Sequence, residues 1–225
     1  MTVRIVTVDG PSGAGKGTVS MALAEKLGFK YLDSGALYRL LALAAERHTV
    51  AISNHKALVI LASHLDICFE YTEGRGTKIL LEGEDVGGQL RSESIAKLAS
   101  QLAIYTDVRI ALIERQRLFA VAPGLVADGR DMGTVVFPKA NLKIYLTASA
   151  EERAARRYKQ LLEKGDNVSL RAVHVQVNER DQRDMSRQVA PLYPAEEAIL
   201  IDTSDLSADA VVHRLLEIAV VHGLL

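Results

Sequence analysis

A glycine-rich stretch from Gly10 to Thr18, G-P-S-G-A-G-K-G-T, has the residue types and the spacing of a phosphate-binding loop. Glycines allow the backbone to curl so that successive N–H groups point at one anion. Lys16 can bring a full positive charge to the outer phosphates of a nucleotide. Gly17 stands where the general motif G-x-x-x-x-G-K-[ST] has a hydroxyl, so the usual Mg²⁺ contact is displaced to Thr18 or missing, and no metal ligand is assigned.

The segments on either side of this stretch are the elements that a phosphate-binding loop requires. The apolar run at 4–8 predicts a buried strand, and apolar residues at helical spacing predict a helix over 17–27. The N-terminus of that helix would add its positive dipole end to the loop N–H groups. An ordinary glycine-rich turn is the alternative, and four glycines, a lysine and a threonine in register disfavour it.

A second group of charged residues follows another predicted strand. The short apolar run at 125–127 leads directly into D-G-R-D-M-G at 128–133. Open parallel sheets bind their ligands at the carboxyl ends of the strands. Two aspartates and an arginine between glycines therefore favour a binding site here over an ordinary polar turn.

Further candidate residues lie on predicted helices. Arg39 comes one turn into an apolar helix for which Ser34 is the candidate N-cap. Ser100 and Arg109 flank a break near 105–107 in the helical stretch that follows. Arg39 is either a solvated surface arginine or a phosphate ligand, and the residue pattern alone leaves both readings open.

Two charged helices near the C-terminal end carry more arginines. Arg153 and Arg157 are four residues apart and share one helix face. Arg180, Asp184 and Arg187 follow at i, i+4 and i+7, which predicts one stripe on the second helix. On an isolated helix, such a stripe is typical of a salt-bridged, solvated face.

The remaining pattern predicts an α/β fold. Five apolar strands alternate with helices, which indicates a three-layer core with a five-stranded, mainly parallel sheet. The predicted strands are 4–8, 29–33, 125–127, 141–147 and 198–202. Alternating segments at 66–71 and 77–82, a turn at 72–76, and a turn or short third strand at 84–88 predict an antiparallel insertion at about 66–90. We expect 1–225 to form one domain.

The composition narrows the functional classes. Among 225 residues the net charge is −1, which lacks the basic character of a nucleic-acid-binding protein. No apolar run reaches the roughly 18 residues of a membrane span, and we see no signal peptide. The single cysteine, Cys68, excludes internal disulfides and a cysteine metal cluster. We expect a soluble cytoplasmic protein that binds neither nucleic acid nor membrane.

Phosphate-binding loops serve GTPases, ATPase motors and small-molecule kinases alike. The absence of an Asn-Lys-x-Asp motif weakens the GTPase interpretation. The arginines away from the loop favour a kinase, because phosphoryl transfer between two polyanions needs several fixed positive groups. Arginine supplies a bidentate fork for each phosphate. A slowly hydrolysing nucleotide switch, or a kinase for another acceptor such as UMP or shikimate, remains as the alternative.

Four segments, taken in order along nearly the whole chain, resemble the bacterial cytidylate kinases. They are 10–18, D-S-G-A-L-Y-R at 33–39, D-G-R-D-M-G-T-V-V-F-P at 128–138, and E-R-D-Q-R-D-M-S-R at 179–187. The resemblance implies a P-loop NTPase fold and a nucleoside-monophosphate kinase of pyrimidine metabolism that transfers the γ-phosphate of ATP to CMP or dCMP with Mg²⁺. It also implies a monomer, a monophosphate-binding region at 34–109 that includes the insertion, and a helical lid at 153–190.

The same resemblance implies roles for single residues. Those expected on ATP are Gly10, Pro11, Ser12, Gly13, Ala14, Gly15, Lys16, Gly17, Thr18, Arg153 and Arg157. Those expected on CMP are Ser34, Arg39, Ser100, Arg109, Arg130, Asp131, Arg180, Asp184 and Arg187. The catalytic residues among them would be Lys16 on the transferred group, and Arg130 and Arg187 on the CMP phosphate, which Arg39 would also bind.

Within the CMP set, the resemblance implies a division of labour. Ser100, Arg109 and Asp131 would read the cytosine, and Arg180 and Asp184 would hold the sugar. No general base is needed, because the attacking phosphate is already anionic. The lid must exclude water, and we expect it to be mobile without ligand because its arginines repel one another.

Overall fold

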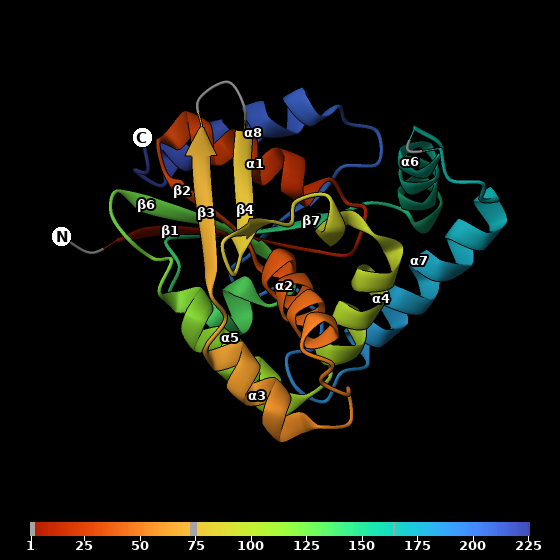
Figure 1. Ribbon diagram of the computed structural model, residues 1–225. Helices are drawn as coiled ribbons and strands as arrows, with labels where there is room; N and C mark the ends of the chain where they lie inside the picture. The colour runs from red at the N-terminus through yellow and green to blue at the C-terminus, as the bar shows by residue number, and fades with distance from the viewer. Residues whose placement is uncertain (1–2, 73–75, 164) are drawn as a thin grey trace. The chain divides into compact units, whose positions relative to one another are not determined.

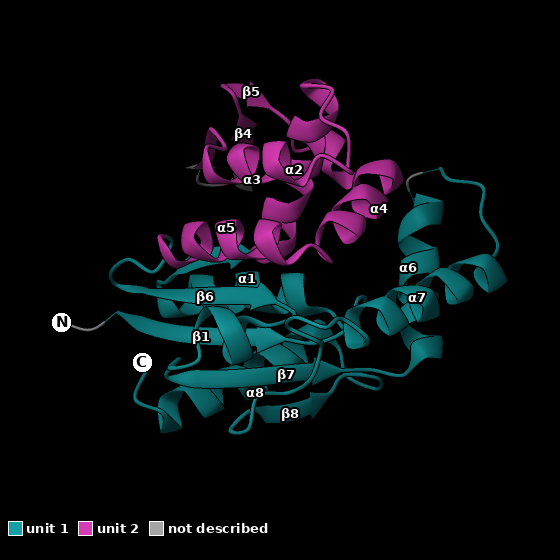
Figure 2. Ribbon diagram, turned by 90° about the horizontal axis from the view of Figure 1, so that it is seen from below, with its two compact units in different colours: residues 1–33, 119–225 teal, residues 34–118 magenta. Residues whose placement is uncertain are grey.

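The computed structural model describes residues 3–72, 76–163 and 165–225. The centre of the turn predicted at 72–76 therefore lies outside the described residues. The chain divides into two compact units, which Figure 2 distinguishes by colour. Unit 1 comprises Met1–Asp33 and Phe119–Leu225, and unit 2 comprises Ser34–Leu118.

Unit 1 is built on the parallel sheet that the sequence predicts. Its strands lie in the order β2-β6-β1-β7-β8, so β1 is central and leads directly into the glycine-rich loop. The bounds are β1 Arg4–Asp9, β2 Lys30–Asp33, β6 Gly124–Gly129, β7 Leu142–Thr147 and β8 Ile199–Asp202. The register pairs Asp9 with both Gly129 and Tyr145, and it pairs Asp33 with Asp128. The carboxyl ends of four strands therefore meet at one edge of the sheet.

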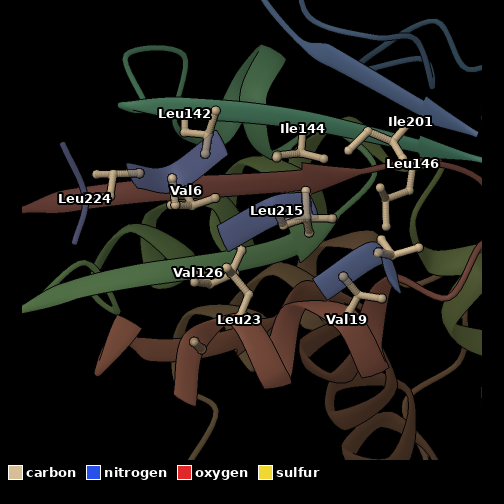
Figure 3. Close-up of a cluster of buried hydrophobic side chains, with 14 of the residues drawn as sticks. Val6, Val19, Leu23, Val126, Leu142, Ile144, Leu146, Ile201, Leu215 and Leu224 are labelled. Atoms are coloured by element: carbon tan, nitrogen blue, oxygen red, sulfur yellow. The ribbon is translucent and has the colours of Figure 1, made fainter. Parts of the chain in front are cut away.

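Two helices cover one face of this sheet. Helix α1, Lys16–Leu27, and helix α8, Ala208–Val221, lie side by side in Figure 1 and share one apolar core with the strands. Figure 3 shows how Val6 and Val126 from the strands meet Leu23 and Leu215 from the helices. The continuous apolar runs of the parallel strands supply the sheet side of this core.

Helices α6, Ala150–Glu163, and α7, Leu170–Met185, pack on each other around a small apolar cluster of their own. The predicted stripe on α7 is wrong for Arg187, because the helix ends at Met185 and Arg187 lies beyond it. The backbone turns back at this point, so that the Leu192 N–H donates to the Asp184 carbonyl at 2.9 Å. A continuing helix would have used that carbonyl four residues along the chain.

Unit 2 combines helices with the predicted antiparallel sheet. The helices are α2 Ser34–Arg47, α3 His55–Ser63, α4 Glu93–Leu102 and α5 Thr106–Arg117, with a 3-10 turn at Gln89–Arg91. The sheet order is β3-β4-β5, with β3 Ile67–Thr72, β4 Gly76–Leu81 and β5 Glu84–Asp85. The insertion, its short third strand and the helix break near 105–107 are confirmed. Across the described ranges, no helix has the length and apolarity to cross a membrane.

Candidate functional site

The glycines of the loop between β1 and α1 are required by its backbone. Gly10 has φ +147°, and a Cβ atom there would overlap the Leu146 carbonyl oxygen. Gly13 has φ +82°, and its Cβ would lie 3.0 Å from the Cβ of Arg153. Gly15 has φ +84° and is the N-cap of α1. The loop therefore has the tight, left-handed turns that place N–H groups around an anion.

Gly10→Ala is expected to lower the free energy of unfolding by about 2–6 kcal/mol, since it combines backbone strain with overpacking, each of about 1–3 kcal/mol. Gly28→Ala is the matched control, because Gly28 also has positive φ, 65°, but a Cβ there meets nothing within 4 Å. Urea unfolding measures both losses. Equal losses would show that the approach of Leu146 to the loop is unimportant.

Lys16 is the first residue of α1 and only 6% exposed. Its ammonium group donates to the Pro11 carbonyl oxygen at 2.9 Å, so it folds back over the loop. The pKa of Lys16 is lowered to about 7 by burial and by the charge of Arg130, against the opposing effect of the Asp128 carboxylate. A polyphosphate in the loop would favour the charged form, because an opposite charge nearby raises the pKa of an amine.

Asp128 is the second-last residue of β6 and lies beside the loop. The Tyr31 hydroxyl donates to its Oδ2 at 3.1 Å, and a Cβ at Gly17 would lie 3.5 Å from the same oxygen. The pKa of Asp128 is raised to about 6, because burial and the like charge of Asp33 outweigh the lowering effect of Lys16. Gly17, which stands where the general motif has a hydroxyl, thus faces the Asp128 carboxylate and the Tyr31 hydroxyl. Sequence reasoning missed this contact because Tyr31 lies on a different strand, β2.

A buried carboxylate joins two of the predicted arginines. Arg130 Nε donates to Asp184 Oδ2 at 2.9 Å, and Arg187 donates to Asp184 Oδ1. Burial alone would raise the pKa of Asp184, but the two arginines outweigh it and lower the pKa below its usual value. Arg180, one turn before Asp184 on α7, is half-buried. The structure therefore brings Arg130, Asp184 and Arg187 together, although Arg187 comes from outside the helix.

Asp184→Asn is expected to destabilise unit 1 by about 3 kcal/mol at neutral pH, because it leaves two arginines without their buried partner. The folded pKa of Asp184 lies below its ordinary value of 3.8, so its ionised form stabilises the fold above that pH. The stabilisation is lost as pH falls through the folded pKa, and the difference from wild type should shrink below about pH 4. Melting curves between pH 3 and pH 7 test this. Asp205→Asn, at an exposed carboxylate, is the control, and a pH-independent difference would contradict the account.

Asp131 follows β6 and precedes a short helix that the sequence did not predict, the π-helical turn η2, Met132–Val136. The Asp131 side chain is buried, and its backbone carbonyl accepts from the N–H groups of Val135 and Val136. The next two N–H groups, of Met132 and Gly133, donate to the carboxylate of Asp9. The pKa of Asp9 is raised to about 7, because burial outweighs the lowering effect of these two N–H groups.

Sequence reasoning missed Asp9. The signal was present, because Asp9 ends the central strand and directly precedes Gly10. The rule that charged residues at the carboxyl ends of parallel strands are functional was applied to the strand before Asp128 and not to the first strand.

Helix α6 contacts the loop directly through Arg153 and indirectly, by way of Thr203, through Arg156. Arg153 pairs with Asp181 at 2.6 Å and donates to the carbonyl oxygens of Ser12 at 3.1 Å and Ala148 at 2.9 Å. Arg156, to which no role was predicted, donates to the Thr203 carbonyl at 2.6 Å. The Thr203 hydroxyl in turn donates to the Ala14 carbonyl at 3.2 Å. The expected repulsion among these arginines is thus offset by the carboxylates of Asp181 and Glu152, which pair with Arg153 and Arg156. Arg157, the next residue on α6, is half-buried.

The predicted residues of unit 2 lie on three of its helices. Ser34, expected as an N-cap, is instead the first residue of α2 and is buried. Arg39, also on α2, is half-buried, and its guanidinium makes no hydrogen bond or ion pair within the described part of the chain.

Ser100 and Arg109 are the other two predicted residues of unit 2. The buried hydroxyl of Ser100, on α4, has no hydrogen-bond partner among the described residues. Arg109, on α5, is 1% exposed, donates to the Ala103 carbonyl at 3.0 Å, and lies 5.8 Å from the centre of the Tyr38 ring. A buried hydroxyl without a hydrogen-bond partner, such as that of Ser100, is unusual in a folded protein.

Comparison with known proteins gives one consistent result. Residues 6–220 match the family model described as cytidylate kinase. The chain is 58% identical over 208 residues to the cytidylate kinase of Shewanella loihica, covering 92% of this chain and 90% of that protein. It is 57% identical over 215 residues to that of Stutzerimonas stutzeri, covering 95% and 94%. A solved structure of an uncharacterized protein from Eubacterium ventriosum, 12% identical with TM-score 0.50 and covering 96% and 97%, shares the fold alone.

Proposed function

Because the chain belongs to the cytidylate kinase family, we propose that it transfers the γ-phosphate of ATP to CMP or dCMP, giving ADP and CDP or dCDP. The family match over residues 6–220 is the observation that carries this proposal. The geometry of unit 1 supports it, since the loop lysine and a pair of arginines lie at the end of one parallel sheet.

The chemistry follows from positions and charges. The N–H groups of the loop and the N-terminus of α1 hold the ATP phosphates, and Lys16 neutralises charge on the migrating phosphoryl group. Arg130 and Arg187 bind the phosphate of CMP, and Asp184 orients both guanidinium groups beforehand. Preorganised charges of this kind lower the barrier because they need no rearrangement during the transfer. Arg180 and Asp184 also hold the sugar.

Recognition of CMP extends to unit 2 in this proposal. Arg39 binds the acceptor phosphate, which is supported by its guanidinium having no partner in the described part of the chain. Ser100 and Arg109 read the ring edge together with Asp131, and the unpartnered Ser100 hydroxyl supports this role. Ser34 lies on α2 five residues before Arg39 and is proposed to contact the same phosphate.

The residues beside the loop fit a Mg²⁺ ion. Magnesium takes oxygen ligands and is usually bound by one or two carboxylates together with substrate phosphates. Asp128 and Asp33 face each other across adjacent strands, and the charge of Asp33 raises the pKa of Asp128. A cation would relieve this repulsion, so we propose Asp128, assisted by Asp33, as its protein ligand. Bound Mg²⁺ would neutralise charge on the β- and γ-phosphates.

The segment 153–190 is proposed to act as a lid over ATP, with Arg153 and Arg157 at its root. Phosphates would add charge-assisted hydrogen bonds to its arginines. We expect amide hydrogen exchange in α6 and α7 to slow several-fold when ATP and CMP, or a bisubstrate analogue, are bound, by comparison with α8 as an internal control. Equal exchange rates in the free and bound states would contradict a closing lid.

A panel of acceptors tests the proposed reaction. CMP and dCMP should be phosphorylated far faster than UMP or shikimate in a coupled assay of ADP formation. A preference for UMP or shikimate would reassign the acceptor, and ADP formation that does not depend on any acceptor would indicate a nucleotide switch. The monomeric state stays a prediction from the family resemblance, and the cytoplasmic location stays a prediction from the composition.

A further inference from the structure

The N-terminus of η2 is capped from a distant part of the chain. Asp131 occupies the N-cap position, where an aspartate ordinarily accepts from the first N–H groups of its own helix. Its side chain makes no such bond. The Asp9 carboxylate takes this place, with Oδ1 accepting from Met132 N at 2.8 Å and Oδ2 from Gly133 N at 2.7 Å.

The contact between β1 and η2 is close and buried. Asp9 is 3% exposed, and both of its carboxylate oxygens are used by the two N–H groups. A Cβ atom at Gly133 would lie 2.9 Å from Thr7 Oγ1 and 3.3 Å from Asp9 Oδ2. Thr7 and Asp9, which point to the same face of β1, therefore fix the position of the backbone that follows Asp131.

We propose that Asp9 is a positioning residue for base selection. By capping η2, Asp9 leaves the Asp131 carboxylate out of the cap, where it can accept from the amino group of cytosine. The same side chain fixes the base-reading segment to the strand that carries the phosphate loop, since Asp9 directly precedes Gly10. This inference rests on the proposed function, in which Asp131 reads the base.

Asp9→Asn tests the inference with little change in shape. An amide has one acceptor oxygen, so its NH₂ group would face one of the two N–H donors and release the start of η2. We expect the ratio of kcat/KM for CMP to that for UMP to fall by about tenfold or more, while the KM for ATP changes by less than about threefold. Thr7→Val is the matched control, since Thr7 packs against the same Gly133 but its hydroxyl has no partner among the described residues.

The outcomes separate this inference from the proposed function. An unchanged ratio in Asp9→Asn, or an equal loss for CMP and UMP, overturns the positioning role. If that variant does not fold, Gly133→Ala pushes η2 away from Asp9 without removing the charge, and an unchanged ratio there has the same meaning. Asp131→Ala is measured in parallel. If it leaves the CMP-to-UMP ratio of kcat/KM unchanged, the proposed role of Asp131 fails. If Asp131→Ala lowers this ratio and Asp9→Asn does not, only the inference about Asp9 is refuted.

Discussion

Lys16→Met is expected to lower kcat by at least about 10²-fold while the protein remains folded, because it removes a preorganised charge from the transferred phosphoryl group. Lys16 is buried, and burial lowers the pKa of its amine, which shows that the charged form is costly in the ligand-free protein. A methionine of similar length should therefore keep or raise the melting temperature. Steady-state kinetics and thermal unfolding of the same preparation measure both effects.

Lys26→Met is the control for this substitution, because Lys26 is an exposed lysine in the last turn of the same helix. It should change neither kcat nor the melting temperature appreciably. If Lys16→Met turned over within a few-fold of wild type, the loop lysine would not act on the transferred group.

Asp131→Ala is expected to narrow the preference for CMP over UMP. Cytosine presents an amino donor at ring position 4 and uracil presents a carbonyl acceptor, so an ionised carboxylate matches only the first. Opposing two acceptors in a buried site leaves a desolvation penalty of about 1–3 kcal/mol, or about 5- to 150-fold in relative kcat/KM. The alanine variant should lose more activity toward CMP than toward UMP and so narrow the ratio of their kcat/KM values by about this factor, as measured with both acceptors.

Asp131→Asn sharpens this test, because its amide can turn its NH₂ group toward the carbonyl of uracil. Activity toward UMP should then rise relative to the alanine variant. An equal loss of both acceptors in both variants would mean that Asp131 supports the backbone around η2 and that base selection resides elsewhere.

The elements that carry the loop could be predicted because their signals are local. The apolar run of β1, the glycines at 10–17 and the helical spacing of α1 each follow from neighbouring residues. Gly10 is also a local signal, since its backbone has a positive φ that few residues other than glycine adopt. The antiparallel insertion was equally readable from its period-two alternation.

What the sequence did not reveal depends on contacts between distant residues. The turn η2 is stabilised by Asp9, which is 123 residues before Met132, and no local pattern marks it. At the end of α7, the Leu192 N–H donates to the Asp184 carbonyl in place of a helical N–H. The i, i+4, i+7 spacing therefore misled the prediction that the helix continues to Arg187. Arg153 was predicted as an ATP contact from the family resemblance, and its bonds to Ser12 and Asp181 could be found only from the fold.

Transfer of a γ-labelled phosphate tests the central claim most directly. Purified protein is incubated with γ-labelled ATP and Mg²⁺, with and without CMP, and the labelled products are separated. The account predicts that the label appears in CDP, one equivalent for each ADP formed, and that little ADP forms without CMP because water is excluded. Label released as inorganic phosphate at the same rate with and without CMP would contradict it.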